Sequence, residues 1–163
     1  MVAARSTLRA AAEPQYRSAG EGGMDSEKRT ALIERIRSLE GSGDVMPVVS
    51  LEAFFEGNDD PGSVGCNLPN HPGAARFYEL LAAIRARTDV QDVVVGIYEI
   101  VEDESSWPFA ETVYVFTSAE PQAVRRWAAE LEPDEVEPGF PYGEPPGTPP
   151  LAQGVIPVRL WWD

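Results

Sequence analysis

The 163-residue sequence contains one cysteine, one histidine and one lysine, namely Cys66, His71 and Lys28. A single cysteine excludes an internal disulfide framework, and a reducing compartment suits such a chain. A single histidine excludes the histidine clusters of transition-metal sites. Any mechanism that needs an imidazole must therefore use His71.

Long apolar runs are also missing. No run approaches the ~20 residues that a membrane-spanning helix needs, and the beginning of the chain lacks the apolar stretch of a secretory signal. We therefore expect a cytoplasmic protein that does not contact a membrane. No glycine-rich phosphate loop follows a predicted strand, and the sequence has no C-x-x-C pair and no internal repeat, so it predicts no cofactor.

Basic residues are scarce where acidic residues are abundant. Residues 1–45 carry seven basic and seven acidic side chains, whereas residues 46–163 carry six arginines and twenty acidic side chains. The whole formal net charge of −14 therefore falls in the second segment. Its arginines are scattered, so it offers no basic strip for a nucleic-acid backbone. A negative field of this kind attracts basic protein partners.

Apolar residues make up 43% of the chain, which is enough for one core of ordinary size. We expect residues 1–23 to be a disordered tail, because they show no sustained periodicity. Residues 24–45 are expected to be an appended amphipathic helix and a linker, since apolar residues recur at helical spacing from Leu32 to Leu39. Residues 46–163 are expected to form a single acidic α+β domain.

The patterns within this domain predict an alternating order of elements. A short extended segment and a helix capped by Ser50 come first. The elements that follow are a strand at 62–68, a helix beginning at Pro72, strands at 93–101 and 112–117, a helix capped by Ser118, and a strand at 155–162. Seven prolines and three glycines in residues 133–150 predict a Pro-rich loop. From residue 62 the order is β-α-β-β-α-β, which is typical of a ferredoxin-like sheet with two helices on one face.

The last predicted strand places two adjacent tryptophans on opposite faces. Trp162 shares a face with aliphatic residues and is expected in the core, whereas Trp161 falls on the other face beside Arg159. Because exposed Trp and Arg are frequent at protein-binding surfaces, Trp161 and Arg159 are candidate partner-binding residues. The alternative is that this face is covered by the segment 46–57 or by the Pro-rich loop, anchored through Phe140 and Tyr142.

Two acidic runs occur in predicted connections. Glu102, Asp103 and Glu104 join two predicted strands, where a solvated hairpin tip is the structural interpretation and a second partner contact is the functional one. The oxygen-rich residues 58–63 lack the alternating ligands and the distal glutamate of an EF-hand loop. We expect an ordinary turn there and no metal site.

Cys66 and His71 bracket the predicted turn between the first strand and its helix, where nucleophiles and bases often lie. Their spacing matches no hydrolase signature. Burial of the cysteine as a small hydrophobe and capping of the next helix by the histidine are the structural interpretations.

The charge distribution favours one functional hypothesis over another. The first is a non-enzymatic acidic interaction protein that binds a basic protein partner, with inhibitors and immunity proteins as one such class. The alternative is a small enzyme or metabolite-binding domain with a pocket around His71 and Cys66. Formation of a homodimer through the open face of the sheet is a further hypothesis.

Overall fold

The structure is a computed structural model that describes residues 23–41 and 43–163. The predicted tail at 1–23 therefore lies, except for Gly23, outside the described residues. In chain order the elements are α3 (Ser26–Leu39), β1 (Val48–Ser50), α4 (Leu51–Phe55), the 3₁₀ helix η1 (Pro61–Ser63), α5 (Ala74–Arg85), β2 (Val90–Glu99), β3 (Phe109–Thr117), α6 (Pro121–Trp127), the 3₁₀ helix η2 (Ala129–Leu131), β4 (Glu135–Pro138) and β5 (Ile156–Trp161). Within the described part of the chain, no helix combines the length and the apolar character needed to span a membrane.

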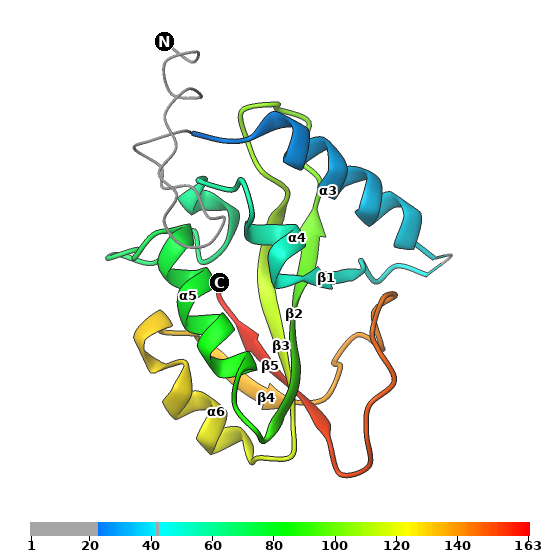
Figure 1. The fold of residues 1–163 in the computed structure, drawn as a ribbon, viewed down its shortest axis with the longest axis vertical. Coiled ribbons are helices and arrows are strands. Elements are labelled where there is room, and N and C mark those ends of the chain that lie inside the picture. Colours follow the sequence, from blue (N-terminus) through cyan, green and yellow to red (C-terminus); the bar gives the residue numbers. More distant parts are fainter. Residues whose placement is uncertain (1–22, 42) are drawn as a thin grey trace.

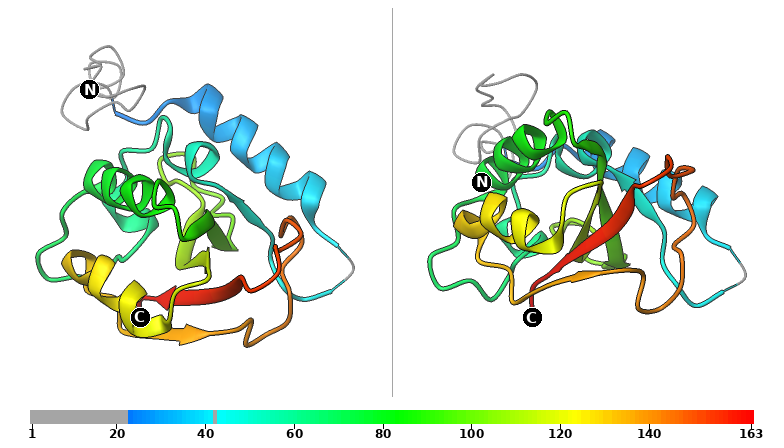
Figure 2. Two further views of the ribbon diagram at one scale, coloured as in Figure 1. Left: turned by 60° about the horizontal axis from the view of Figure 1, so that its bottom comes forward. Right: turned by 90° about the horizontal axis from the view of Figure 1, so that it is seen from below.

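The strands form one five-stranded antiparallel sheet in the order β1-β2-β3-β5-β4. Helices α5 and α6 lie on one side of this sheet, and the segment between β4 and β5 lies on the other (Figures 1 and 2). The expected α+β class is confirmed. The specifically ferredoxin-like arrangement is not confirmed. The first predicted strand, at 62–68, is not formed, and an unpredicted strand, β4, precedes the last one.

The strand predicted at 62–68 is wrong. The carboxylate of Asp60 accepts a hydrogen bond from the Gly62 amide at 2.9 Å, and this contact closes the turn of η1. Only Val64 pairs with the sheet, as an isolated parallel bridge to Ala110. Gly65 then adopts φ +60°, which turns the chain away from an extended path. The following helix begins at Ala74 and not at Pro72, after Gly73 at φ +98°.

The predicted Pro-rich loop at 133–150 contains a strand. Residues 135–138 form β4 at the edge of the sheet, where Val136 pairs with Leu160 of β5 and points into the core. Pro138 is the last residue of β4, and the following Gly139 amide still donates to the Pro157 carbonyl of β5 at 2.9 Å. The rest of the segment is irregular, as expected.

The main core fills the space between the helices and one face of the sheet. Trp107, Trp162, Phe54, Phe55 and Phe77 are among its fully buried side chains. Helix α3 contributes Leu32 and Ile36 to the same core, so its apolar stripe is buried against this chain. Burial of large aromatic and aliphatic side chains is the main source of stability in such a layer.

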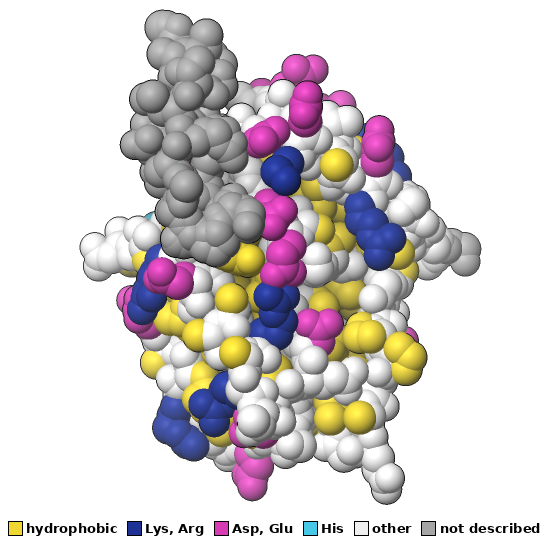
Figure 3. Space-filling view, in the orientation of Figure 1, with side chains coloured by type: hydrophobic (Ala, Val, Ile, Leu, Met, Phe, Trp, Pro, Cys, Tyr) yellow, Lys and Arg dark blue, Asp and Glu magenta, His cyan; other side chains and the backbone are white. Residues whose placement is uncertain are grey.

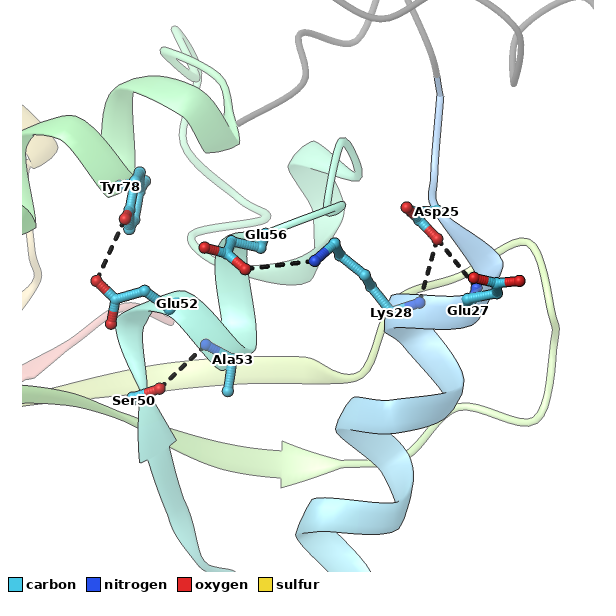
Figure 4. A network of polar contacts seen from close by, with 8 residues as sticks. All are labelled: Asp25, Glu27, Lys28, Ser50, Glu52, Ala53, Glu56 and Tyr78. Atoms are coloured by element: carbon cyan, nitrogen blue, oxygen red, sulfur yellow. Dashed lines mark hydrogen bonds and ion pairs between the residues drawn. The ribbon is translucent and has the colours of Figure 1, made fainter. Parts of the chain in front are cut away.

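Helix α3 docks through a close approach to the end of α4. Gly57 has φ +82°, and a Cβ there would lie 2.8 Å from the Cβ of Asp25, so only glycine fits beside the start of α3. The Asp25 carboxylate caps α3, and Lys28 forms an ion pair at 3.4 Å with Glu56, the C-cap residue of α4 (Figure 4). As predicted, the hydroxyl of Ser50 caps α4 by accepting from the Ala53 amide.

The two adjacent tryptophans at the end of the chain should differ in their contribution to stability. Trp162 is 1% exposed, packs edge-on against Phe77, and donates its indole N–H to the Leu131 carbonyl at 2.8 Å. We expect Trp162→Ala to cost about 3 to 5 kcal/mol in the free energy of unfolding, and Trp161→Ala less than half of that. Urea denaturation of both variants measures the difference, and equal losses would contradict the assignment of the two faces.

Candidate functional site

The register of β3 and β5 places the candidate residues on the sheet face opposite the main core. Thr112 pairs with Trp161, and Tyr114 pairs with Arg159. Because side chains alternate along a strand, these four lie on one face while Val113 and Leu160 point into the core. The predicted placement of the strand faces is therefore observed.

Arg159 and Trp161 lie next to each other, but Arg159 is not exposed. Arg159 is 8% exposed, and its Nη2 donates to Glu135 at 2.7 Å. Its guanidinium carbon lies 5.9 Å from the centre of the Trp161 ring. Trp161 itself is half-buried, and its indole N–H donates to Oε1 of Glu111 at 3.1 Å. The half-buried Trp161 ring is thus held by a hydrogen bond to a carboxylate and lies near a buried arginine.

The Pro-rich segment covers part of this face. Phe140 packs edge-on against Tyr114 and Phe116, with ring centres 5.1 and 6.3 Å apart. A small second core forms there from Val48, Val94, Tyr114 and Phe116, with Phe140, Leu151 and Val155 packed against it. The expected anchoring by Phe140 is therefore observed. Tyr142 is not an anchor, because 79% of it is exposed.

The uncovered part of the face contains a groove of about 400 Å³, which we call the tyrosine groove. Gly96 has no side chain, so the surface of the sheet is low between Thr112 and Tyr114. Tyr98 and Tyr142 are 53% and 79% exposed. Burial raises the pKa of Tyr114. The groove is lined by Asp44, Val45, Met46, Gly96, Ile97, Tyr98, Glu111, Thr112, Tyr114, Tyr142 and Pro145, so both charged residues in it are acidic.

The acidic run at 102–104 is exposed at the turn between β2 and β3. The buried Arg29 of α3 donates to the carbonyls of Val101, Asp103 and Ser106 and fixes this turn. The Asp103 carboxylate accepts from the amide and hydroxyl of Ser105, and these bonds lower its pKa. Acidic side chains gather at this end of the molecule (Figure 3). Among the described residues, no hydrogen bond or ion pair joins this turn to Trp161 or Arg159.

Several acidic and basic side chains on α4 and α5 form ion pairs. They lie side by side over α4 and α5 in Figure 3. Arg85 donates to both oxygens of Glu52 at 2.9 and 2.5 Å, which lowers the pKa of that carboxyl. Arg76 bridges Glu79 and Glu130 in the same way. Paired charges on this side contribute less to the external field than the unpaired acidic groups elsewhere.

The structure engages the His71 ring with the backbone and leaves Cys66 exposed. The His71 Nδ1 accepts from the Gly73 amide at 2.9 Å, so its Nε2 carries the proton and donates to the Val64 carbonyl at 2.8 Å. The His71 ring also stacks on Phe77. Both ring nitrogens thus form hydrogen bonds with backbone groups just before α5. The sequence predicts a helix cap at this position, and the N-cap residue itself is Gly73. Cys66 is exposed and not buried.

The oxygen-rich residues 58–63 form an internally bonded turn. The amide of the buried Asn58 donates to the Ser63 hydroxyl at 3.0 Å, and its oxygen accepts from the Asp60 amide. Asp60 also accepts from the backbone of Gly62 and Trp107. In the part of the chain that the structure describes, no group of three or more His, Cys, Asp or Glu side chains is placed to hold a metal ion.

Sequence reasoning missed most of the tyrosine groove. Its residues come from four separate stretches of the chain, around positions 45, 97, 112 and 143. One indication was present, because Gly96 interrupts an otherwise apolar strand, and such a glycine often marks a close approach or an open position.

The fold and the groove together define a class: an α+β protein with an acidic, aromatic groove on a half-covered antiparallel sheet. The chain matches the family described as "Uncharacterized protein YfbO family" over residues 27–160, and it belongs to that family. It is 36% identical over 139 residues to "Uncharacterized protein YfbO" of Escherichia coli (strain K12), a match that covers 80% of this chain and 98% of the relative. No solved structure matches the chain significantly.

The contacts of His71 predict a structural effect for its replacement. His71→Ala removes the acceptor of the Gly73 amide and the ring that stacks on Phe77, and we expect a loss of about 1 to 2 kcal/mol in the free energy of unfolding. Asn70→Ala, at an exposed neighbouring position, is the control and should change stability little. Thermal or urea unfolding compares the two variants. A His71→Ala protein as stable as the control would contradict the structural role.

Proposed function

We propose that this protein is a non-enzymatic acidic interaction protein that binds a basic protein partner through the open part of its sheet. The observation that carries the proposal is the tyrosine groove, where exposed aromatic side chains surround a hollow whose charged lining residues, Asp44 and Glu111, are both acidic. Inhibitors and immunity proteins are the narrower class that we favour. A cytoplasmic location is part of the proposal, supported by the single unpaired Cys66.

Two physical features support a protein partner. Tyr and Trp side chains supply large contact areas at low entropic cost, and Trp161, Tyr98 and Tyr142 lie around one face. The surplus of acidic groups in residues 46–163 attracts a basic surface from a distance. The aromatic groups therefore hold the partner, and the acidic groups accelerate its approach.

The alternative pocket around His71 and Cys66 receives no comparable support. Both nitrogens of His71 are engaged with the backbone, and neither residue lines the tyrosine groove. A general base needs a nitrogen that can reach a substrate proton. We therefore retain the interaction hypothesis.

The binding role of Trp161 can be tested against a matched tryptophan. Trp127 of α6 is also half-buried and lies under an arginine, with the guanidinium carbon of Arg87 3.9 Å from its ring centre, but it belongs to the helical side of the molecule. Immobilised wild-type protein should retain a basic protein from a lysate of the source organism. Trp161→Ala should lose most of this retention and Trp127→Ala should keep it, as measured by quantitative mass spectrometry.

The contrast between the two variants separates specific binding from general attraction to an acidic protein. Retention that is equal in all three proteins would contradict the proposed surface. A wild-type protein that retains nothing from the lysate, but behaves as a dimer by solution mass, would instead assign the face to a second copy of this chain.

The acidic turn at 102–104 should affect the rate of association more than the stability of the complex. We expect the double variant Glu102→Lys/Glu104→Lys to bind the recovered partner about tenfold more slowly with little change in dissociation, because both side chains are exposed. Asp103 is left unchanged, since its carboxylate holds the turn. The control is Glu34→Lys/Glu40→Lys, which changes the net charge equally on α3 and its C-cap residue. Stopped-flow or surface-plasmon measurements with equal rates for the two double variants would remove this turn from the binding surface.

A further inference from the structure

We propose that the tyrosine groove receives an arginine side chain of the basic partner, with its guanidinium group against Glu111. This inference rests on the proposed function and names the chemistry that the groove recognises. It goes beyond overall charge, because a groove of about 400 Å³ with aromatic walls and one oriented carboxylate fits a particular kind of side chain.

Glu111 is placed as a receptor for a cation. Its Oε1 accepts the indole N–H of Trp161 at 3.1 Å, and this bond fixes the direction of the carboxylate on β3. Within residues 23–41 and 43–163, no lysine or arginine forms an ion pair with Glu111, whereas Glu52, Glu130 and Glu135 each have an arginine partner. A half-buried, oriented carboxylate that no described lysine or arginine pairs with is a favourable position for the cation of a partner.

The walls of the groove favour arginine over lysine. Tyr98 and Tyr142 are more than half exposed, and the buried Tyr114 of β3 also lines the groove. The planar guanidinium group stacks on aromatic rings while its edge donates two hydrogen bonds to a carboxylate. An ammonium group is more strongly hydrated and presents no flat face for stacking. The groove therefore combines aromatic rings and a carboxylate, the two groups that favour arginine over lysine.

The floor of the groove provides the necessary depth. A Cβ at Gly96 would contact Thr112 and Tyr114 at ordinary distances of 3.5 to 3.6 Å, so a Cβ fits at this position. A larger side chain at Gly96 would extend into the groove and occupy the space in front of Thr112. Gly96→Val is therefore a variant that fills the groove while keeping the strand.

The test uses N-acetyl-arginine amide as the probe and N-acetyl-lysine amide as the comparison. In ¹⁵N NMR spectra the Trp161 indole N–H, assigned with Trp161→Phe, reports on Glu111 because it donates to that carboxylate. We expect arginine amide to shift this signal with a dissociation constant in the millimolar range, and lysine amide to bind at least about fivefold more weakly.

Three variants complete the test. Glu111→Gln keeps an acceptor for the indole and loses the charge, so it should bind arginine amide at least about tenfold more weakly. Gly96→Val should abolish the shift, and Glu137→Gln, which is exposed on the same face but does not line the groove, should leave it unchanged. An equal response to lysine amide, or an unaltered response in Glu111→Gln, would overturn the assignment of an arginine site.

The two proposals fail in different ways. If the wild-type groove does not bind arginine amide while partner retention still depends on Trp161, the arginine site is wrong and the interaction surface stands. If arginine amide binds but no partner is retained through Trp161, the arginine site stands and the proposed function is wrong.

Discussion

The alternation of side chains along β5 is the constraint on which the rest of this structure depends. Val158, Leu160 and Trp162 close the main core, so Arg159 and Trp161 must lie on the opposite face. A shift of one residue in the register of β5 would move Trp162 out of the core and bury the charge of Arg159 in it. The same pairing with β3 brings Trp161 to Glu111 and so orients the carboxylate at the tyrosine groove.

The Pro-rich segment then decides how much of the second face remains open. Phe140 covers Tyr114 and Phe116, and the Val48 amide donates to the Pro146 carbonyl at 3.0 Å, so this segment is tied to β1 as well as to the middle of the sheet. Proline restricts the chain before it folds, which lowers the entropic cost of holding an irregular segment against a surface. The tyrosine groove is the part that stays open, and Tyr142 and Pro145 of this segment line it together with Gly96.

The patterns in the sequence predicted the elements that have strong internal periodicity. The apolar stripe of α5 and the valine-rich β2 are where they were expected, because many residues repeat the same preference. The strand expected at 62–68 failed because Asp60 and Gly65 impose turns that outweigh the strand propensity of Val64. β4 was missed because only Val136 within it is apolar, and its pairing is provided by β5.

The candidate site was predictable only in part, for a physical reason. Trp161 and Arg159 were found because they belong to one strand, where alternation is a local rule. The tyrosine groove is assembled from stretches that meet only in the folded chain, so Tyr98, Glu111 and Tyr142 carried no common pattern in the sequence. The burial of Arg159 likewise depends on Glu135 of β4, a strand that the sequence did not predict.

The central claim is that the open part of the sheet is the surface where a basic partner binds. Hydrogen–deuterium exchange on the complex with a recovered partner tests it most directly, because protection maps the contact without any substitution. The account predicts new protection in the segments that line the tyrosine groove, around residues 96–98, 111–114 and 142–145, and none on α6. Protection confined to α5 and α6, with the groove segments unchanged, would contradict it.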